Sequence, residues 1–442
     1  MTNPVRLKLI TAISVVIGCV IGSGVFVKPG RVLVATGSSN LAILAWILGG
    51  IISLAGGLTI AEIAFRIPKT GGVYTYMEEL YGKTMGFVCG WVQTVIYGPA
   101  LFAALAMFFA SLLIPFLGLS EGTLKPISLI AVYLLAAICA ISTKTSALIQ
   151  NATTLIKLLP ILAIGILGLF MGEQTIFGVA LPEVTERAGL SAAVLATLWA
   201  YDGWMQVANI AGELENPAKN LPRAIVIGIL TVMSAYLLVN ISLFHVLDHA
   251  QIAELGERAA SQAAVVIFGS IGGTLISLGI LVSIFGALNG NILTMVRVPF
   301  AIANRSLFPC REKFATLHPK FQTPTYSIIL QSVVATIMIL LLDPNRITDI
   351  GIFSMYLFYG VVFIGIFKVR KQYGAPKAGE YKVPLYPFIP LIAIAGCLFI
   401  TYGMIQQSAV SEATKFDPLI SILIAAAGYP IYKFLEYKNK KA

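Results

Sequence analysis

The stretch "GCVIGSGVFVKPG", residues 18–30, interrupts the first long apolar run of the chain. Its centre holds Gly18, Gly22, Ser23 and Gly24, where a membrane-spanning helix is expected. Glycine costs about 1 kcal/mol per residue in a helix interior relative to alanine. The stretch therefore predicts that the helix unwinds near residues 20–24, although glycines of this kind also serve close helix–helix packing.

The composition is that of a membrane protein. The 442 residues are 58% hydrophobic and 11% charged, with a mean hydropathy of +0.88, whereas soluble domains carry about 25% charged residues. Apolar runs long enough to cross a bilayer as helices predict an all-α polytopic protein of twelve spans. The eighth span is too long for one crossing and is expected to continue as a cytosolic helix. The expected spans are 9–36, 40–66, 84–116, 125–142, 147–171, 190–211, 222–248, 263–303, 324–342, 347–369, 386–407 and 416–435.

The net charge of +10 is distributed unevenly between the loops on the two sides of the expected spans. With the N-terminus inside, 22 of the 30 Lys and Arg residues fall on the inner side and seven on the outer side. This asymmetry is the positive-inside pattern, and it predicts a plasma-membrane protein with both termini in the cytoplasm. It explains the basic charge without a nucleic-acid partner.

The five cysteines and three histidines show no metal-ligand spacing and no nucleophile–base arrangement. Four of the cysteines lie in apolar runs, where a free cysteine acts as a small hydrophobic residue. We therefore expect no metal, no cofactor, no disulfide framework and no enzymatic activity.

A second interruption, "WAYDGW" (199–204), lies in the sixth apolar run. An acid at a helix centre costs about 2.5–3.5 kcal/mol on insertion scales. Spans one and six begin two halves of five spans each, and paired interruptions at corresponding positions indicate the binding site of an inverted-repeat transporter.

The two breaks offer complementary charges. Free N–H groups at Ser23, Gly24 and Val25 suit an anion, and free carbonyls of Val20, Trp199, Ala200 and Asp202 suit a cation. An α-amino acid zwitterion needs both. The Asp202 side chain either contacts the substrate or has a structural role, facing a water-filled cavity or capping the second half-helix.

The chain resembles the amino acid–polyamine–organocation transporters, and among them the L-amino acid transporter branch. The resemblance rests on "VIGSGVFVKPG", "AEIAFRIPKTGGVYTYMEELYG", "WAYDGW", "ENPAKNLPRAI" and "SIFGALNGNILTMVRVPFAIANRSLFP", in this order over nearly the whole chain. It implies a LeuT-type fold of two inverted five-helix repeats, residues 1–171 and 172–370, followed by two extra helices and a basic tail in 371–442. It also implies sodium-independent exchange of amino acids.

The resemblance also implies site residues. Gly22, Ser23 and Gly24 would bind the substrate carboxylate. The break at Asp202 and Gly203 and the carbonyls named above would bind its amine. Trp199 would close over the substrate, and Phe285 and Asn289 would line the site from span eight.

Lys157 is the only charged residue in the fifth span. The resemblance places it beside the first break, where sodium-coupled relatives hold a cation, bonding to carbonyls and to Ser23 or its neighbours. A permanently charged Lys157 would make transport independent of sodium and protons, and a titrating one would couple it to protons; a purely structural role is the third possibility. Tyr236 resembles a family tyrosine that hydrogen-bonds near this position, or it is a packing residue.

Two departures from the family pattern refine the expectation. The loop "FLGLSEGTLKP" (116–126) lacks the cysteine that links animal members to a heavy subunit, so we expect no such partner. Met205 replaces a polar residue of some large-substrate members, which favours alanine- or serine-sized substrates.

Two further groups of charges have open roles. Glu62 and Arg66 are spaced as an ion pair or an inner gate. Glu213 and Glu215 either lock the inner gate or are solvated.

These observations predict a sodium-independent exchanger of small or medium neutral amino acids, working by alternating access. A proton-coupled symporter of the same fold is the first alternative. A cationic amino acid or polyamine transporter, or a channel or sensor, ranks lower.

Overall fold

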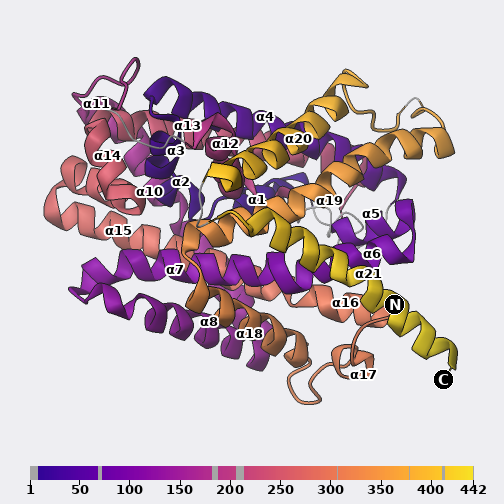
Figure 1. Ribbon diagram of the computed structural model, residues 1–442. Coiled ribbons are helices and arrows are strands. Elements are labelled where there is room, and N and C mark those ends of the chain that lie inside the picture. Colours follow the sequence, from indigo (N-terminus) through magenta and orange to yellow (C-terminus); the bar gives the residue numbers. More distant parts are fainter. Residues whose placement is uncertain are drawn as a thin grey trace.

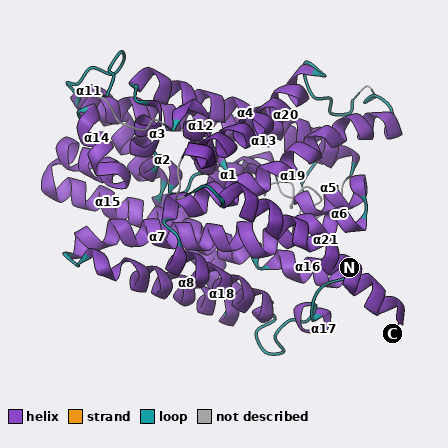
Figure 2. Cartoon of the chain, viewed as in Figure 1, coloured by secondary structure: helices purple, strands orange, loops and turns teal. Residues whose placement is uncertain are grey.

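The computed structural model of the chain describes residues 8–67, 72–181, 188–205, 214–305, 307–377, 379–410 and 414–441. Figure 2 shows helices joined by loops throughout these ranges. Nine helices there are long and apolar enough to cross a membrane, and three shorter apolar helices, Leu158–Met171, Gly189–Tyr201 and Thr325–Leu341, account for the other expected spans. The prediction of an all-α polytopic protein is confirmed.

The first half of the chain begins with a helix in three pieces, α1, α2 and α3. Two π-helical turns, η1 and η3, lie within spans three and five, and such turns are frequent at functional sites. The elements are α1 (Leu9–Val20), α2 (Gly24–Val27), α3 (Pro29–Thr36), α4 (Ser39–Arg66), α5 (Gly72–Tyr81), α6 (Lys83–Val92), η1 (Gln93–Tyr97), α7 (Gly98–Leu117), η2 (Glu121–Thr123), α8 (Leu124–Ile141), α9 (Thr143–Ile156), α10 (Leu158–Leu162), η3 (Ala163–Leu167) and α11 (Gly168–Met171).

The second half begins with α12, which stops near the middle of the expected sixth span. The expected extension of span eight is present as the separate helix α16. The elements are α12 (Gly189–Tyr201), α13 (Pro217–Val246), α14 (His249–Leu255), η5 (Gly256–Arg258), α15 (Ala259–Met295), α16 (Arg297–Arg305), α17 (Arg311–Phe314), α18 (Thr325–Leu341), α19 (Pro344–Tyr373), α20 (Phe388–Val410) and α21 (Asp417–Lys441).

Many large apolar side chains lie exposed on the outer surface. Ile130, Phe170, Ile271, Leu341 and Leu398 are between 65% and 81% exposed, which suits contact with lipid chains and not with water. In Figure 1 the short helices α5, α16 and α17 and the C-terminus lie at one end of the molecule, and α11 and α14 lie at the opposite end.

Behind the two breaks lies a fully buried aromatic cluster. The Trp46 ring meets Tyr201 and Tyr236 edge to face, with ring centroids 6.1 and 5.6 Å apart, and the two tyrosine rings are 5.1 Å apart. Aromatic pairs in this geometry add about 0.5–1.5 kcal/mol beyond the area they bury. The cluster joins α4, α12 and α13 behind the interrupted segments.

Candidate functional site

Both predicted breaks are present. The first helix ends at Val20, Ile21 is extended, and helix resumes at Gly24. The sixth span loses its helical conformation at Asp202, and Gly203 has a φ of +111°. The continuation of span six, including the predicted gate residue Glu213, lies outside the described residues.

The two breaks face each other closely enough to require glycine. A Cβ on Gly24 would lie 2.4 Å from the Cα and Cβ of Ala200. A Cβ on Gly203 would lie 2.6 Å from the carbonyl oxygen of Cys19, at a φ that L side chains rarely adopt. The glycines of both motifs thus let the two interrupted segments touch through their backbones.

Between the breaks lies a cavity of about 40 Å³, lined by Cys19, Val20, Gly22, Ser23, Gly24, Leu101, Leu105, Trp199, Asp202, Gly203, Ala287 and Asn291. One water molecule takes up roughly 10–15 Å³ of such a cavity. The cavity therefore has room for only a few groups of that size. Seven of the ten predicted substrate-binding residues line it, and Ala200 lies directly behind Gly24.

The floor of the cavity is rich in unused donors. The Ser23 hydroxyl is buried and has no hydrogen-bond partner among the described residues. The backbone N–H groups of Ser23, Gly24 and Val25 also donate no backbone hydrogen bond to any described residue. Buried donors of this kind are normally satisfied, and they converge at the start of α2 in the arrangement that binds anions.

Tyr236 joins the two breaks. Its hydroxyl lies 3.0 Å from the carbonyl oxygen of Val20 and 2.9 Å from that of Ala200. One hydroxyl proton is shared between these two acceptors, so each carbonyl keeps accepting capacity for a second donor. Tyr236 is therefore more than a packing residue.

Lys157 reaches the first break from the junction of α9 and α10. Its buried ammonium donates to the carbonyl oxygens of Gly18 and of Ile21, the latter at 2.8 Å. These are carbonyls that the break leaves without helical partners. We also expected Lys157 to bond to Ser23, but among the described residues its ammonium donates only to these two carbonyls.

Asp202 is held from outside the cavity. The hydroxyl of Tyr97, at the end of the π-helical turn η1, donates to its carboxylate, and Tyr359 lies beside it. Tyr97 had no functional signal in the sequence, since an aromatic residue in an apolar run is most often a packing residue. Asp202 thus lines the cavity, and its carboxylate is anchored by a residue of the third span.

Two predicted residues of span eight lie away from the cavity. Phe285 packs against Phe109, with ring centroids 5.6 Å apart. Asn289 is buried and exchanges hydrogen bonds with Ser146, at 2.7 and 2.8 Å, which ties α15 to α9.

The face of α15 that meets the first break lies at Ser283, Ala287 and Asn291, which are four residues apart. Ser283 approaches the carbonyl oxygen of Gly22 at 3.4 Å, and Ala287 and Asn291 line the cavity. The four-residue spacing of small and polar side chains in an apolar run is the signal that identifies this face.

Trp199, near the end of α12, lines the cavity. Its ring packs edge to face on Phe108, and the Lys28 ammonium lies 5.9 Å from the Trp199 ring centroid. Lys28 is fully buried and donates at 2.8 Å to both Asn345 and Thr348.

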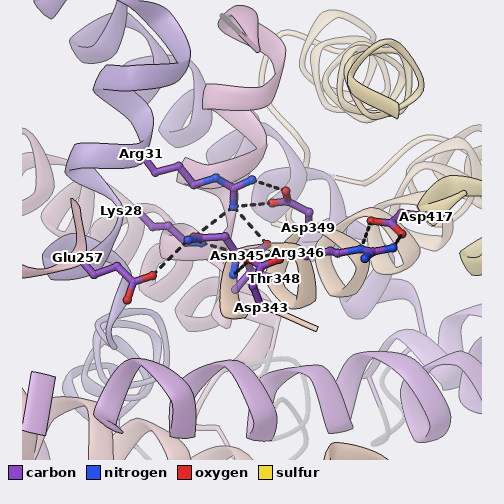
Figure 3. Close-up of polar contacts among 9 residues, drawn as sticks. All are labelled: Lys28, Arg31, Glu257, Asp343, Asn345, Arg346, Thr348, Asp349 and Asp417. Carbon is purple, nitrogen blue, oxygen red and sulfur yellow. Dashed lines mark hydrogen bonds and ion pairs between the residues drawn. The ribbon is translucent and has the colours of Figure 1, made fainter. Parts of the chain in front are cut away.

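A polar network extends from Lys28 along the start of α19 (Figure 3). Arg31 donates to both carboxylate oxygens of Asp349, Asn345 donates to Glu257 at 3.2 Å, and Arg346 pairs with Asp417 at 2.5 and 2.7 Å. The network begins at Lys28, beside the Trp199 ring. In the sequence these residues are only isolated charged and polar residues near span ends, so the network could not be predicted from it.

At the other end the predicted pair of Glu62 with Arg66 is wrong. Glu62 accepts two 2.7 Å hydrogen bonds from Arg370 and one from the Val383 N–H. Arg66 instead pairs with Glu380 at 3.0 Å. The spacing of four residues allowed the pair, but α19 and the loop after it supply closer partners.

The comparisons with known proteins agree with this architecture. A family model described as amino acid permease matches residues 7–427. The chain is 48% identical to the serine/threonine exchanger SteT of Bacillus subtilis, covering 99% of this chain and 98% of that protein. It is 30% identical to the human b(0,+)-type amino acid transporter 1, over 98% of this chain and 88% of the relative, and 30% identical to the human cystine/glutamate transporter, over 99% and 86%.

Proposed function

Since the chain belongs to the amino acid permease family, we propose that it exchanges small neutral L-amino acids across the membrane without sodium. The observation that carries this proposal is the pairing of the two breaks around one cavity, with unused donors on one side and carbonyls on the other. The carboxylate would bind at Ser23 and the start of α2. The amine would bind at the carbonyls of Val20 and Trp199 and at Asp202.

The small volume of the cavity and the bulk around it favour a short side chain. Leu101, Leu105 and Trp199 line the cavity, and Met205, 6% exposed, follows the second break. The name of the exchanger SteT, serine/threonine exchanger, fits the same size class. We therefore choose serine and alanine as the first substrates to test.

Lys157 takes the place of a coupling cation in this proposal. The support is that its ammonium donates to two carbonyls beside the first break, where it would stabilise the unwound helix in place of a bound cation. Transport would then need neither sodium nor a proton gradient, and exchange would be driven by the amino acid gradients alone.

The proposed orientation has both termini in the cytoplasm of the cell whose plasma membrane holds the protein. It is supported by the 22 to seven distribution of basic residues. It also agrees with the gathering of α5, α16, α17 and the C-terminus at one end (Figure 1). Residues 1–171 and 172–370 would form the two inverted repeats, with the remainder of the chain outside them.

We also propose that the transporter works without a disulfide-linked partner. The loop 116–126 has no cysteine, and all five cysteines are free, with Cys310 alone exposed.

The test is uptake of radiolabelled L-serine into proteoliposomes that are empty or preloaded with unlabelled amino acids, with and without sodium and a proton gradient. Exchange predicts strong uptake into preloaded vesicles only, unchanged by either ion. Equal uptake into empty vesicles with an inward proton gradient would favour proton symport instead.

A further inference from the structure

A groove of about 720 Å³ lies between the beginning of α13 and the loop that joins α19 to α20. Lys219, Pro222, Arg223, Val226 and Ile227 line it from α13. Tyr381, Lys382 and Pro384 line it from the loop, and Leu58 lines it from α4. It is separate from the cavity between the two breaks.

The groove has an excess of positive charge. The side chains of Lys219, Arg223 and Lys382 are exposed and make no ion pair or hydrogen bond with any described residue. The acidic side chain in the lining, Glu380, is neutralised by Arg66 at 3.0 Å. Three cations therefore face one groove with no opposing free carboxylate in the described lining.

Two of the three cations lie at the end of a helix that is long and apolar enough to cross a membrane. Lys219 and Arg223 lie in the first two turns of α13, a membrane-spanning helix, and Ile227 follows on the same face one turn deeper. Ile227 is 43% exposed, and Leu230 beyond it is 41% exposed.

On the opposite wall lies Lys382. Leu385 and Phe388, which follow it in the chain outside the groove lining, are 74% and 67% exposed. Cations at the end of a span with exposed apolar side chains next to them are what a phospholipid, charged at its head and apolar below, requires.

The wall of the groove is fixed. Glu62 accepts the Val383 N–H at 2.7 Å, and Glu380 is tied to Arg66 and to the Lys377 N–H. The loop thus presents Lys382 at a set position opposite Lys219 and Arg223, and a phosphate between them would link α13 to the segment between α19 and α20.

We propose that this groove binds the phosphodiester headgroup of an anionic phospholipid. Each Lys or Arg near an anionic membrane surface contributes about 1 kcal/mol, so each single substitution is expected to weaken binding roughly fivefold and all three together roughly a hundredfold.

The test is a titration of the purified full-length protein in detergent with phosphatidylglycerol, followed by native mass spectrometry. The variants are the singles Lys219→Ala, Arg223→Ala and Lys382→Ala and the triple. The matched control removes three exposed lysines elsewhere, Lys320, Lys371 and Lys440. Phosphatidylcholine and glycerol phosphate serve as further ligands, and thermal unfolding without lipid checks that each variant is folded.

The proposal predicts one tightly bound phosphatidylglycerol that the groove variants lose and the control keeps. Equal binding by the groove and control triples would overturn it, and so would unchanged binding in all three singles should the triple fail to fold. If glycerol phosphate binds as tightly as phosphatidylglycerol, the groove is a site for free phosphate groups, and the proposal of a phospholipid site is overturned.

Discussion

Replacing Tyr236 with phenylalanine tests whether the two breaks act as one site. The substitution keeps the ring and its packing but removes the hydroxyl shared by the carbonyls of Val20 and Ala200, at 3.0 and 2.9 Å. Leaving a buried acceptor without its donor costs about 1–3 kcal/mol, which is roughly 5- to 150-fold in an equilibrium constant. We expect Tyr236→Phe to slow serine exchange in proteoliposomes within that range.

Tyr201→Phe is the matched control. The Tyr201 hydroxyl is equally buried and donates at 3.0 Å to the carbonyl of Trp46 in α4, away from the first break. Both variants should lower the melting temperature by similar amounts, and only Tyr236→Phe should slow exchange strongly. If the two variants slow exchange equally, the loss comes from stability alone and the reasoning about a joint site fails.

Three further substitutions test the contacts around the site. Gly24→Ala should lower the melting temperature and abolish exchange, because the new Cβ would lie 2.4 Å from the α12 backbone; Gly22→Ala, with 3.4 Å of space, should fold normally, and equal destabilisation would contradict this. Lys157→Ala should abolish exchange at normal expression, measured by serine uptake, because two break carbonyls lose their donor; wild-type uptake would remove the cation role. Arg31→Lys should lower the melting temperature, because lysine lacks the guanidinium fork that donates to both oxygens of its carboxylate partner; an unchanged melting temperature would show that the network adds no stability.

The backbone of the site, with its two helix breaks, could be predicted from the sequence alone. Clustered glycines and an intramembrane acid at matching positions weaken the helix wherever they occur, so the breaks at Gly22 and Asp202 follow from local propensity and burial costs. The lone charge at Lys157 pointed to a buried partner for the same reason, because a charge deep in a span requires one.

Side chains that reach the site through tertiary packing were harder to predict. Asn289 and Asn291 are two residues apart on one helix, and only the rotation of α15 decides which meets the cavity. Tyr97 and Lys28 reach their partners across helices distant in sequence. Glu62 has a suitable partner four residues away in Arg66, yet in the structure it bonds instead to Arg370 and to the loop that follows.

The central claim is that the paired breaks bind one amino acid by its backbone. A cryo-electron microscopy map of the transporter with bound L-serine tests it directly. The account predicts the carboxylate at about 3 Å from the N–H groups at Ser23, Gly24 and Val25, with the amine toward Val20, Trp199 and Asp202. Serine density away from both breaks, or with its carboxylate at Lys157, would contradict it.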